Sequence, residues 1–206
     1  MVDNLITRYP KLILVKDDII AAYKILEQTY LGGGKVLCCG NGGSCADADH
    51  IVGELMKSFK FKRKMPYYLT ESFSEFGEIG EKLAANLEGA LPAISLNSHN
   101  ALSSAYINDT NAEMVYAQLL YGLGNSGDTL IALTTSGNSA NCVYAAVAAK
   151  AMGINVIALT GQGGGKIAEI SDVTIKAPEQ ETYLVQELHL PVYHCLCAML
   201  EERFFG

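Results

Sequence analysis

The sequence predicts an α/β protein in which a central parallel sheet of about five strands lies between two layers of helices, with long N- and C-terminal helices. Short apolar runs bounded by glycine or polar turn residues recur along the chain, and segments with helical spacing separate them. The runs are rich in Val, Ile and Leu without strict alternation, which is typical of parallel strands covered on both faces. This alternation indicates a doubly wound, three-layer αβα sandwich. We expect one domain spanning residues 1–206, since half of the residues are hydrophobic and can form a sizeable core.

In chain order, the expected strands are KVLCC (35–39), LPAISL (91–96), DTLIALTT (128–135), INVIALT (154–160) and DVTIKA (172–177). Helical spacing occurs between them, at 45–60, 112–123 and 139–152. Parallel strands need crossover connections of this length, usually helical. The pattern therefore favours a parallel sheet over hairpins.

Two further helices are expected at the ends of the chain. Residues 12–30 have apolar positions round more than half of the helix circumference, and residues 183–204 form a long, very apolar closing helix. Together they suggest a helical subunit interface, with the N-terminal helical segment, residues 1–30, used in oligomer contacts. The alternative is a large core within one subunit, because apolar helices are commonest in protein interiors.

The connection at 61–91 is predicted to be an irregular insertion, because it mixes aromatics, acids and glycines. It is either a short helix with flanking loops lying over a site or a plain surface insertion, since long connections are tolerated at the surface. The basic run KSFKFKRK (57–64) just before it is interpreted as a solvated helix end.

Composition excludes several classes of partner and location. The net charge is −7 and no other Lys/Arg cluster occurs, so nucleic acid is not an expected partner. Six cysteines without a C-x-x-C pair indicate reduced thiols. No secretory pattern opens the chain, and no apolar stretch approaches the ~18 residues that span a bilayer. We expect a soluble, cytoplasmic protein with no membrane partner.

Three expected strands end in similar loops, at 40–44, 134–139 and 160–166, each combining glycine with small hydroxyl or amide side chains before a helical segment. Ligands of open parallel sheets bind at this edge. Backbone N–H groups, hydroxyls and a helix N-terminus can hold an anion there without a cationic side chain. A sharp turn with an N-cap explains any single loop equally well. None is a Walker loop or G-x-G-x-x-G, so no nucleotide is indicated.

Ionisable residues gather on two of the expected helices. At about 100° per residue, Asp47, His50 and Glu54 fall on one face, where His50 and Glu54 can share a metal or act in proton transfer. An exposed polar face is the alternative. On the last helix Gln186 and His194 fall within about 80° of one another, with Pro191 expected to kink the helix between them.

A lone histidine on such an apolar helix is more often part of the core. His189 points about 140° away from His194 and is interpreted as a core residue.

Five motifs occur in a fixed order: GNGGSCADADHIVGEL, AYIND, TTSGNSAN, ALTGQGGGK and VQELHLPVYH. They closely resemble the sugar isomerase (SIS) domain and, within it, the bacterial phosphoheptose isomerases, over nearly the whole chain. The resemblance implies the flavodoxin- or Rossmann-like SIS fold and a homotetramer with active sites between subunits. It also implies conversion of D-sedoheptulose 7-phosphate to D-glycero-D-manno-heptose 7-phosphate, for the heptose of lipopolysaccharide and other surface polysaccharide.

The resemblance also implies site residues. The substrate-binding set comprises Asn41, Gly42, Gly43, Ser44, Asn108, Asp109, Thr134, Thr135, Ser136, Ser139 and Gln186, with the phosphate on the loop from Thr134 to Ser139. The metal set, for one zinc per subunit, comprises His50, Glu54, Gln186 and His194. Two features depart from the family pattern: Tyr183 stands where an aspartate is frequent, and the 61–91 connection is longer. Both bear on the sugar more than on the reaction type.

For the mechanism, the resemblance implies an aldose–ketose isomerisation through an enediol, with Glu54 as base and His194 as acid. Zinc would polarise the substrate carbonyl. A Glu54 that ligates a metal is less free as a base, and the sequence leaves its role open.

Three rival functions stay open. One is a non-catalytic sugar-phosphate sensor, another is an adaptor that binds the replication initiator, and the third is an isomerase for a different sugar phosphate. The first two would keep the loops without needing Glu54 and His194, and this chain has both residues.

Overall fold

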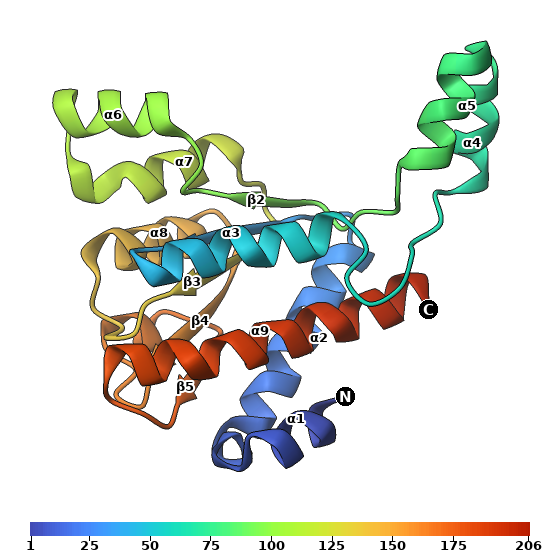
Figure 1. Cartoon of the computed structure of the whole chain (residues 1–206). Helices are drawn as coiled ribbons and strands as arrows, with labels where there is room; N and C mark the ends of the chain where they lie inside the picture. Colours follow the sequence, from blue (N-terminus) through green and yellow to red (C-terminus); the bar gives the residue numbers. More distant parts are fainter.

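The predicted apolar runs form one parallel sheet with the strand order β2–β1–β3–β4–β5 (Figure 1). The computed structural model describes every residue from 1 to 206. The strands are β1 (Val36–Gly40), β2 (Ala93–Ser95), β3 (Thr129–Leu133), β4 (Asn155–Gly161) and β5 (Val173–Ala177). Because β2 and β3 lie on opposite sides of β1, the strand order reverses at β1 and β3. In parallel sheets this is where ligands bind, at the carboxyl ends of the strands.

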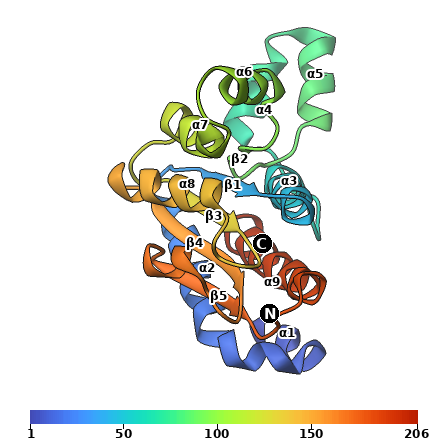
Figure 2. The same ribbon diagram turned by 90° about the vertical axis from the view of Figure 1, so that its left-hand side faces the viewer.

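Helices cover both faces of the sheet (Figure 2). Alternate strand residues point into two separate clusters: Cys38 and Ile131 join one, and Leu37 and Leu130 join the other. The first cluster is covered by α2 (Lys16–Leu31), α3 (Gly43–Met56) and α9 (Thr182–Phe205), and the second by α7 (Val115–Leu123) and α8 (Ala140–Ala151). The three-layer sandwich expected from the sequence is confirmed.

The N-terminal helix begins later than expected. The chain starts with α1 (Val2–Arg8), continues as a 3-10 segment (Pro10–Val15), and becomes α-helical only at α2. Pro10 at the start of the 3-10 segment has no N–H to continue α1. In α2 the buried residues Ile19, Ala22 and Leu26 face the core of the same subunit. The role of residues 1–30 in oligomer contacts stays a prediction.

The closing helix α9 runs uninterrupted through Pro191, so the expected kink does not end it. Eleven of its residues are buried within this subunit, most of them apolar, and its role in a subunit interface stays a prediction. None of the helices has the length and apolar character that crossing a membrane requires.

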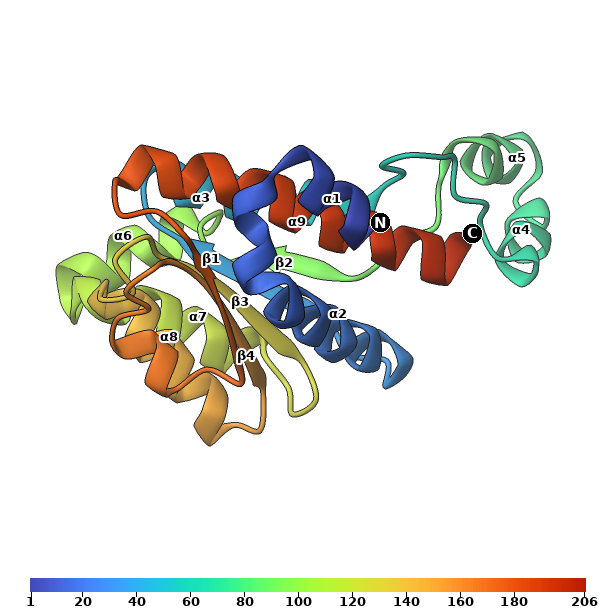
Figure 3. The ribbon, with the colours of Figure 1, turned by 90° about the horizontal axis from the view of Figure 1, so that it is seen from below.

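Residues 61–91 are not irregular, because they contain a hairpin of two helices, α4 (Tyr67–Ser74) and α5 (Gly77–Asn86). The hairpin projects away from the sandwich on a stem made of two irregular segments, residues 57–66 and 87–92 (Figures 1 and 3). Both helices are short and only Gly80 is buried, so the pattern of a core-facing helix is missing from the sequence.

The basic run at 57–64 is also corrected by the structure. The helix α3 ends at Met56, before the run, and the run is an irregular segment that leads to the hairpin. Its lysines are exposed, but Arg63 is buried. A further helix, α6 (Asn100–Asp109), was not expected and precedes a 3-10 turn (Ala112–Met114).

Candidate active site

The loops that follow β3 and β4 pack backbone against backbone at the carboxyl edge of the sheet. Gly137 has φ +68°, and a Cβ there would lie 1.9 Å from the carbonyl oxygen of Gly164. The N–H of Ile167 donates to the Gly137 carbonyl (3.0 Å), and that of Gly161 donates to the Thr135 carbonyl (2.9 Å). Only glycine fits at 137, because any side chain would clash with the neighbouring loop.

The loop after β1 is joined to α8 by a reciprocal amide pair. Asn41 Nδ2 donates to Asn141 Oδ1, and Asn141 Nδ2 donates to Asn41 Oδ1, both at 2.9 Å. The Tyr116 hydroxyl donates to the Gly40 carbonyl at 2.5 Å. Ser44 is buried beneath this loop, where its N–H donates to the Asn41 carbonyl (3.0 Å). Neither Asn141 nor Tyr116 was a predicted site residue, although Asn141 ends the motif TTSGNSAN, because their contacts join segments 100 and 76 residues apart.

The loop at 134–139 presents hydroxyls at the N-terminus of α8. Thr134 Oγ1 lies 3.1 Å from Ser139 Oγ. Ser139 is the N-cap residue of α8, yet its side chain makes no capping hydrogen bond, and Ser136 is exposed. Hydroxyls beside the positive end of a helix suit an oxyanion such as phosphate.

Gln186 lies over the first loop. A Cβ on Gly43 would lie 2.8 Å from Gln186 Nε2 and 2.9 Å from its Oε1, so the amide of α9 covers the start of α3. The glycine at 43 therefore makes room for Gln186. This places Gln186 beside the predicted substrate loop.

A chain of hydrogen bonds links α3 to α9 one turn further on. His50 Nε2 lies 3.0 Å from Glu54 Oε1, so these two side chains are in hydrogen-bond contact, and their joint role stays a prediction. His50 Nδ1 lies 3.0 Å from the Tyr193 hydroxyl, and that hydroxyl donates to Asp47 Oδ1 at 3.0 Å. The face of Asp47, His50 and Glu54 predicted from helical spacing is therefore completed by Tyr193, which sequence reasoning missed.

The Tyr193 hydroxyl has one proton to give in this series of hydrogen bonds. Tyr193 has one hydroxyl proton and gives it to Asp47, so its oxygen can accept from His50 Nδ1. Burial raises the pKa of the Asp47 carboxyl, and the Tyr193 hydrogen bond opposes that rise. These contacts connect Glu54 on α3 to Tyr193 on α9 through His50.

His194 joins the cluster through its ring. It lies edge-on to His50 with ring centroids 4.9 Å apart, and Phe59 lies on another side at 5.4 Å. Burial and, after it, the nearby His50 lower the pKa of His194. His194 Nε2 and Glu54 Oε2 are both buried without a hydrogen-bond partner, although Lys57 Nζ lies 4.0 Å from that oxygen. Two buried polar atoms without partners mark a place for a ligand.

The three predicted ligands on this cluster, His50, Glu54 and His194, are adjacent, and their nitrogen and oxygen atoms are donors that zinc accepts. In the side-chain arrangement described, however, no three His, Cys, Asp or Glu side chains surround a common point. Gln186, the fourth predicted ligand, lies over Gly43. The donor types and the two partnerless atoms fit a metal. To bind one, the side chains would have to change position so that their donor atoms face a common point.

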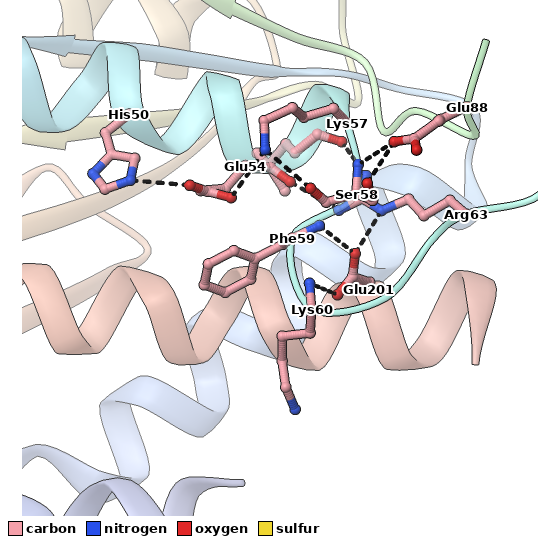
Figure 4. A network of polar contacts seen from close by, with 10 residues as sticks. His50, Glu54, Lys57, Ser58, Phe59, Lys60, Arg63, Glu88 and Glu201 are labelled. Atoms are coloured by element: carbon pink, nitrogen blue, oxygen red, sulfur yellow. Dashed lines mark hydrogen bonds and ion pairs between the residues drawn. The ribbon is translucent and has the colours of Figure 1, made fainter. Parts of the chain in front are cut away.

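The last turn of α3 is held in place from outside the cluster. Arg63 Nη1 donates to the Leu55 carbonyl (2.6 Å) and Nη2 donates to the Glu54 carbonyl (2.8 Å), so the guanidinium caps the helix that carries Glu54 (Figure 4). Glu201 on α9 accepts from Arg63 Nε and from the N–H groups of Phe59 and Lys60. These contacts fix the chain on both sides of Phe59.

Two predicted positions lie apart from this cluster. Asn108 and Asp109 are exposed at the end of α6, where Asn108 Nδ2 donates to Asp109 Oδ1 (2.7 Å). Their substrate-binding role stays a prediction. His189, by contrast, is confirmed as a core residue, since it is fully buried and its Nε2 lies 3.2 Å from the Thr160 carbonyl.

Residues 76–161 match a family model described as the SIS domain. Together with three hydroxyl- and glycine-rich loops at the carboxyl edge of a parallel sheet, this defines an SIS-domain protein. A phosphoheptose isomerase of Akkermansia muciniphila is 34% identical over 92% of this chain and 87% of its own length. Solved phosphoheptose isomerases from Neisseria gonorrhoeae and Francisella tularensis align with TM-scores of 0.75 and 0.76, at 29% and 28% identity, covering 97% of this chain and 94% of each of theirs. The chain belongs to the phosphoheptose isomerase family.

Proposed function

We propose that this protein interconverts a phosphorylated ketose and aldose, and that its substrate is D-sedoheptulose 7-phosphate, with D-glycero-D-manno-heptose 7-phosphate as product. The observation that carries the proposal is the pair of buried, partnerless atoms Glu54 Oε2 and His194 Nε2 in one cluster. A sensor or adaptor on this fold has no use for such a pair. The choice of substrate is supported by the similarity to proteins named phosphoheptose isomerases.

The phosphate of the substrate binds the loop at 134–139. Thr134 and Ser139 offer hydroxyls, and α8 adds the partial positive charge of its N-terminus. Asn41 and Gln186 contact the sugar between that loop and Glu54. Binding energy from the remote phosphate orients the reacting carbons.

Proton transfer follows the geometry of the cluster. The Glu54 carboxylate removes the proton from C1 of the ketose, and the electron pair forms the C1–C2 double bond of the enediol. His194 supplies a proton to the oxygen on C2. Glu54 then returns its proton at C2, and the C1 hydroxyl gives its proton to His194 as the aldehyde forms at C1. Each positioned group contributes about 10²–10⁴-fold to the rate. His50 holds Glu54 Oε1 through its hydrogen bond, which leaves Oε2 for the substrate.

We include zinc in the proposal, one ion per subunit, held by His50, Glu54, Gln186 and His194. When bound, it would supply a Lewis acid that polarises the substrate carbonyl. Mixed nitrogen and oxygen ligands without a thiolate favour an exchangeable ion over a tightly held structural one.

The assembly we propose is a homotetramer with its active sites between subunits. Ile13 and Leu14 are exposed in the N-terminal segment, which supports contacts there. All six cysteines are free thiols, which supports a location in the reducing cytoplasm.

A panel of ketose and aldose phosphates, each assayed for interconversion with and without a chelator, tests the proposal. We expect turnover of sedoheptulose 7-phosphate, reduced by the chelator. Turnover of another sugar phosphate alone would replace the substrate and keep the reaction. No turnover of any member, with or without added zinc, would favour the sensor.

A further inference from the structure

The helical hairpin α4–α5 carries large apolar side chains that nothing in the subunit covers. Tyr67, Tyr68, Phe76 and Ile79 are between 66% and 79% exposed. All four belong to the helical hairpin, which stands clear of the sandwich (Figures 1 and 3). Exposed apolar residues scattered singly are ordinary, but four large ones on one short projecting element, two at the start of α4 and two at the turn into α5, indicate an interaction surface.

The hairpin has little stability of its own. Its helices are 8 and 10 residues long, below the length at which isolated helices persist in water. Their contact is close, since a Cβ on Gly80 would lie 1.6 Å from the Phe73 carbonyl oxygen, yet Gly80 is the one buried residue of the two helices. A second surface that covers the apolar side chains would stabilise the hairpin.

Charge is divided along the hairpin. Residues 67–86, which form the two helices, contain four acids and one lysine: Glu71, Glu75, Glu78, Glu81 and Lys82. The stem carries the opposite charge, with four exposed lysines and one acid: Lys57, Lys60, Lys62, Lys64 and Glu88. Arg63 is not available to a partner, because it is buried and paired with Glu201. The helices of the hairpin therefore carry a net negative charge, and the stem that joins them to the sandwich carries a net positive charge.

We propose that the hairpin is a self-association surface, on which the α4–α5 hairpin of a second copy of this chain packs antiparallel about a two-fold axis. A two-fold interface joins the same patch on both copies, so the patch must be complementary to itself. Antiparallel pairing meets this condition, because the acidic helices of each copy lie on the basic stem of the other copy. The apolar side chains of the two hairpins then cover one another.

The stem connects the proposed pairing surface to the active site. The stem begins at the end of α3 and includes Phe59, whose ring lies 5.4 Å from that of His194. A second copy seated on the stem lies next to the segment that holds α3 in place. The inference concerns assembly and does not rest on the proposed reaction.

The mass of the assembly, measured by analytical ultracentrifugation, tests the apolar part of the contact. The variant F76D/I79D is expected to fall to half the wild-type mass or less, with unchanged circular dichroism since both side chains are exposed. The matched control is Tyr121→Asp on α7, which is 70% exposed and away from the hairpin, and it should keep the wild-type mass. A monomeric wild type, or an F76D/I79D variant of wild-type mass, would overturn the proposal.

Charge reversal tests the antiparallel arrangement. The variant E75K/E78K and the variant K62E/K64E should each lower the association constant at least tenfold, and their combination in one chain should restore it. Loss without restoration would refute the pairing of helices and stem. Independently, carbodiimide cross-linking of mixed ¹⁴N and ¹⁵N protein should join Glu75 or Glu78 of one copy to a stem lysine of the other. Cross-links confined within single copies would refute it as well.

Discussion

Arg63 and Glu201 form an ion pair of 2.9 Å in which both side chains are completely excluded from solvent. Burial by itself raises the pKa of the Glu201 carboxyl, but the N–H groups of Phe59 and Lys60 and the Arg63 guanidinium outweigh it, so the pKa is lowered overall. The pair joins the stem of the hairpin to α9 and, through Arg63, caps α3. One contact therefore holds together three segments that surround the proposed catalytic residues.

Removing one partner of this pair should strongly destabilise the fold. Glu201→Gln leaves the Arg63 guanidinium buried without its counter-charge, for which we expect a loss of about 3–5 kcal/mol in the free energy of unfolding. Urea denaturation of purified protein measures it. The control is Arg203→Ala, which removes an exposed pair with Glu27 and should cost roughly 1 kcal/mol or less. Equal losses in the two variants would contradict the structural role of the buried pair.

Glu54→Gln should abolish most of the turnover while leaving the substrate bound. The amide keeps the size of the carboxylate but cannot take a proton from carbon, so kcat should fall by about 10²–10⁴-fold. A coupled assay gives kcat, and calorimetry with sedoheptulose 7-phosphate gives the affinity. Glu202→Gln, which is exposed on the last turn of α9, is the control and should match the wild type. Unaltered turnover of Glu54→Gln would remove this residue from the role of base.

Ser139→Ala should weaken binding of the phosphate. A hydrogen bond to a charged group contributes roughly 1.5–3 kcal/mol, so we expect the substrate dissociation constant to rise about tenfold or more. Titration with sedoheptulose 7-phosphate and with inorganic phosphate measures the change. Ser126→Ala, in the exposed loop before β3, should leave both affinities as they are. A loss confined to kcat would place Ser139 in the chemistry instead.

His189 should make the fold sensitive to mild acid. Burial lowers its pKa to about 4, against the opposing hydrogen bond to the Thr160 carbonyl. The unfolded chain therefore binds more protons below pH 6.5, and stability falls as the pH drops from about 6.5 to about 4. The full effect is about 3 kcal/mol, which corresponds to ~2.5 pKa units.

The measurement is the free energy of unfolding at several pH values across that window. Protonating carboxylates also contribute, so the comparison is with His189→Gln, whose stability should decline less steeply. His99→Gln, at the start of α6, should decline as the wild type does. Parallel curves for wild type and His189→Gln would exclude His189 as the source.

The sheet, the loops and the pair His50–Glu54 were predicted because their signals are local. Uniformly apolar runs identify buried parallel strands, and helical spacing fixes which side chains share a face. The contacts of Tyr193, Asn141 and Glu201 were not predicted, because their partners are 100 to 146 residues away in sequence. The two helices of the hairpin α4–α5 were not predicted for a different reason: their large apolar residues are exposed and give no core-facing pattern.

By itself, the sequence determined the layer architecture, the three strand-end loops and the residue types of the proposed site, because each depends on the order of residues within a few turns or strands. The tertiary structure decided which of them meet. It brought His194 against His50, placed Gln186 over Gly43, and turned Arg63 from an apparent surface cation into the buried cap of α3. The physical reason is that such contacts form between elements whose positions are set only when α3 and α9 pack side by side on the same sheet.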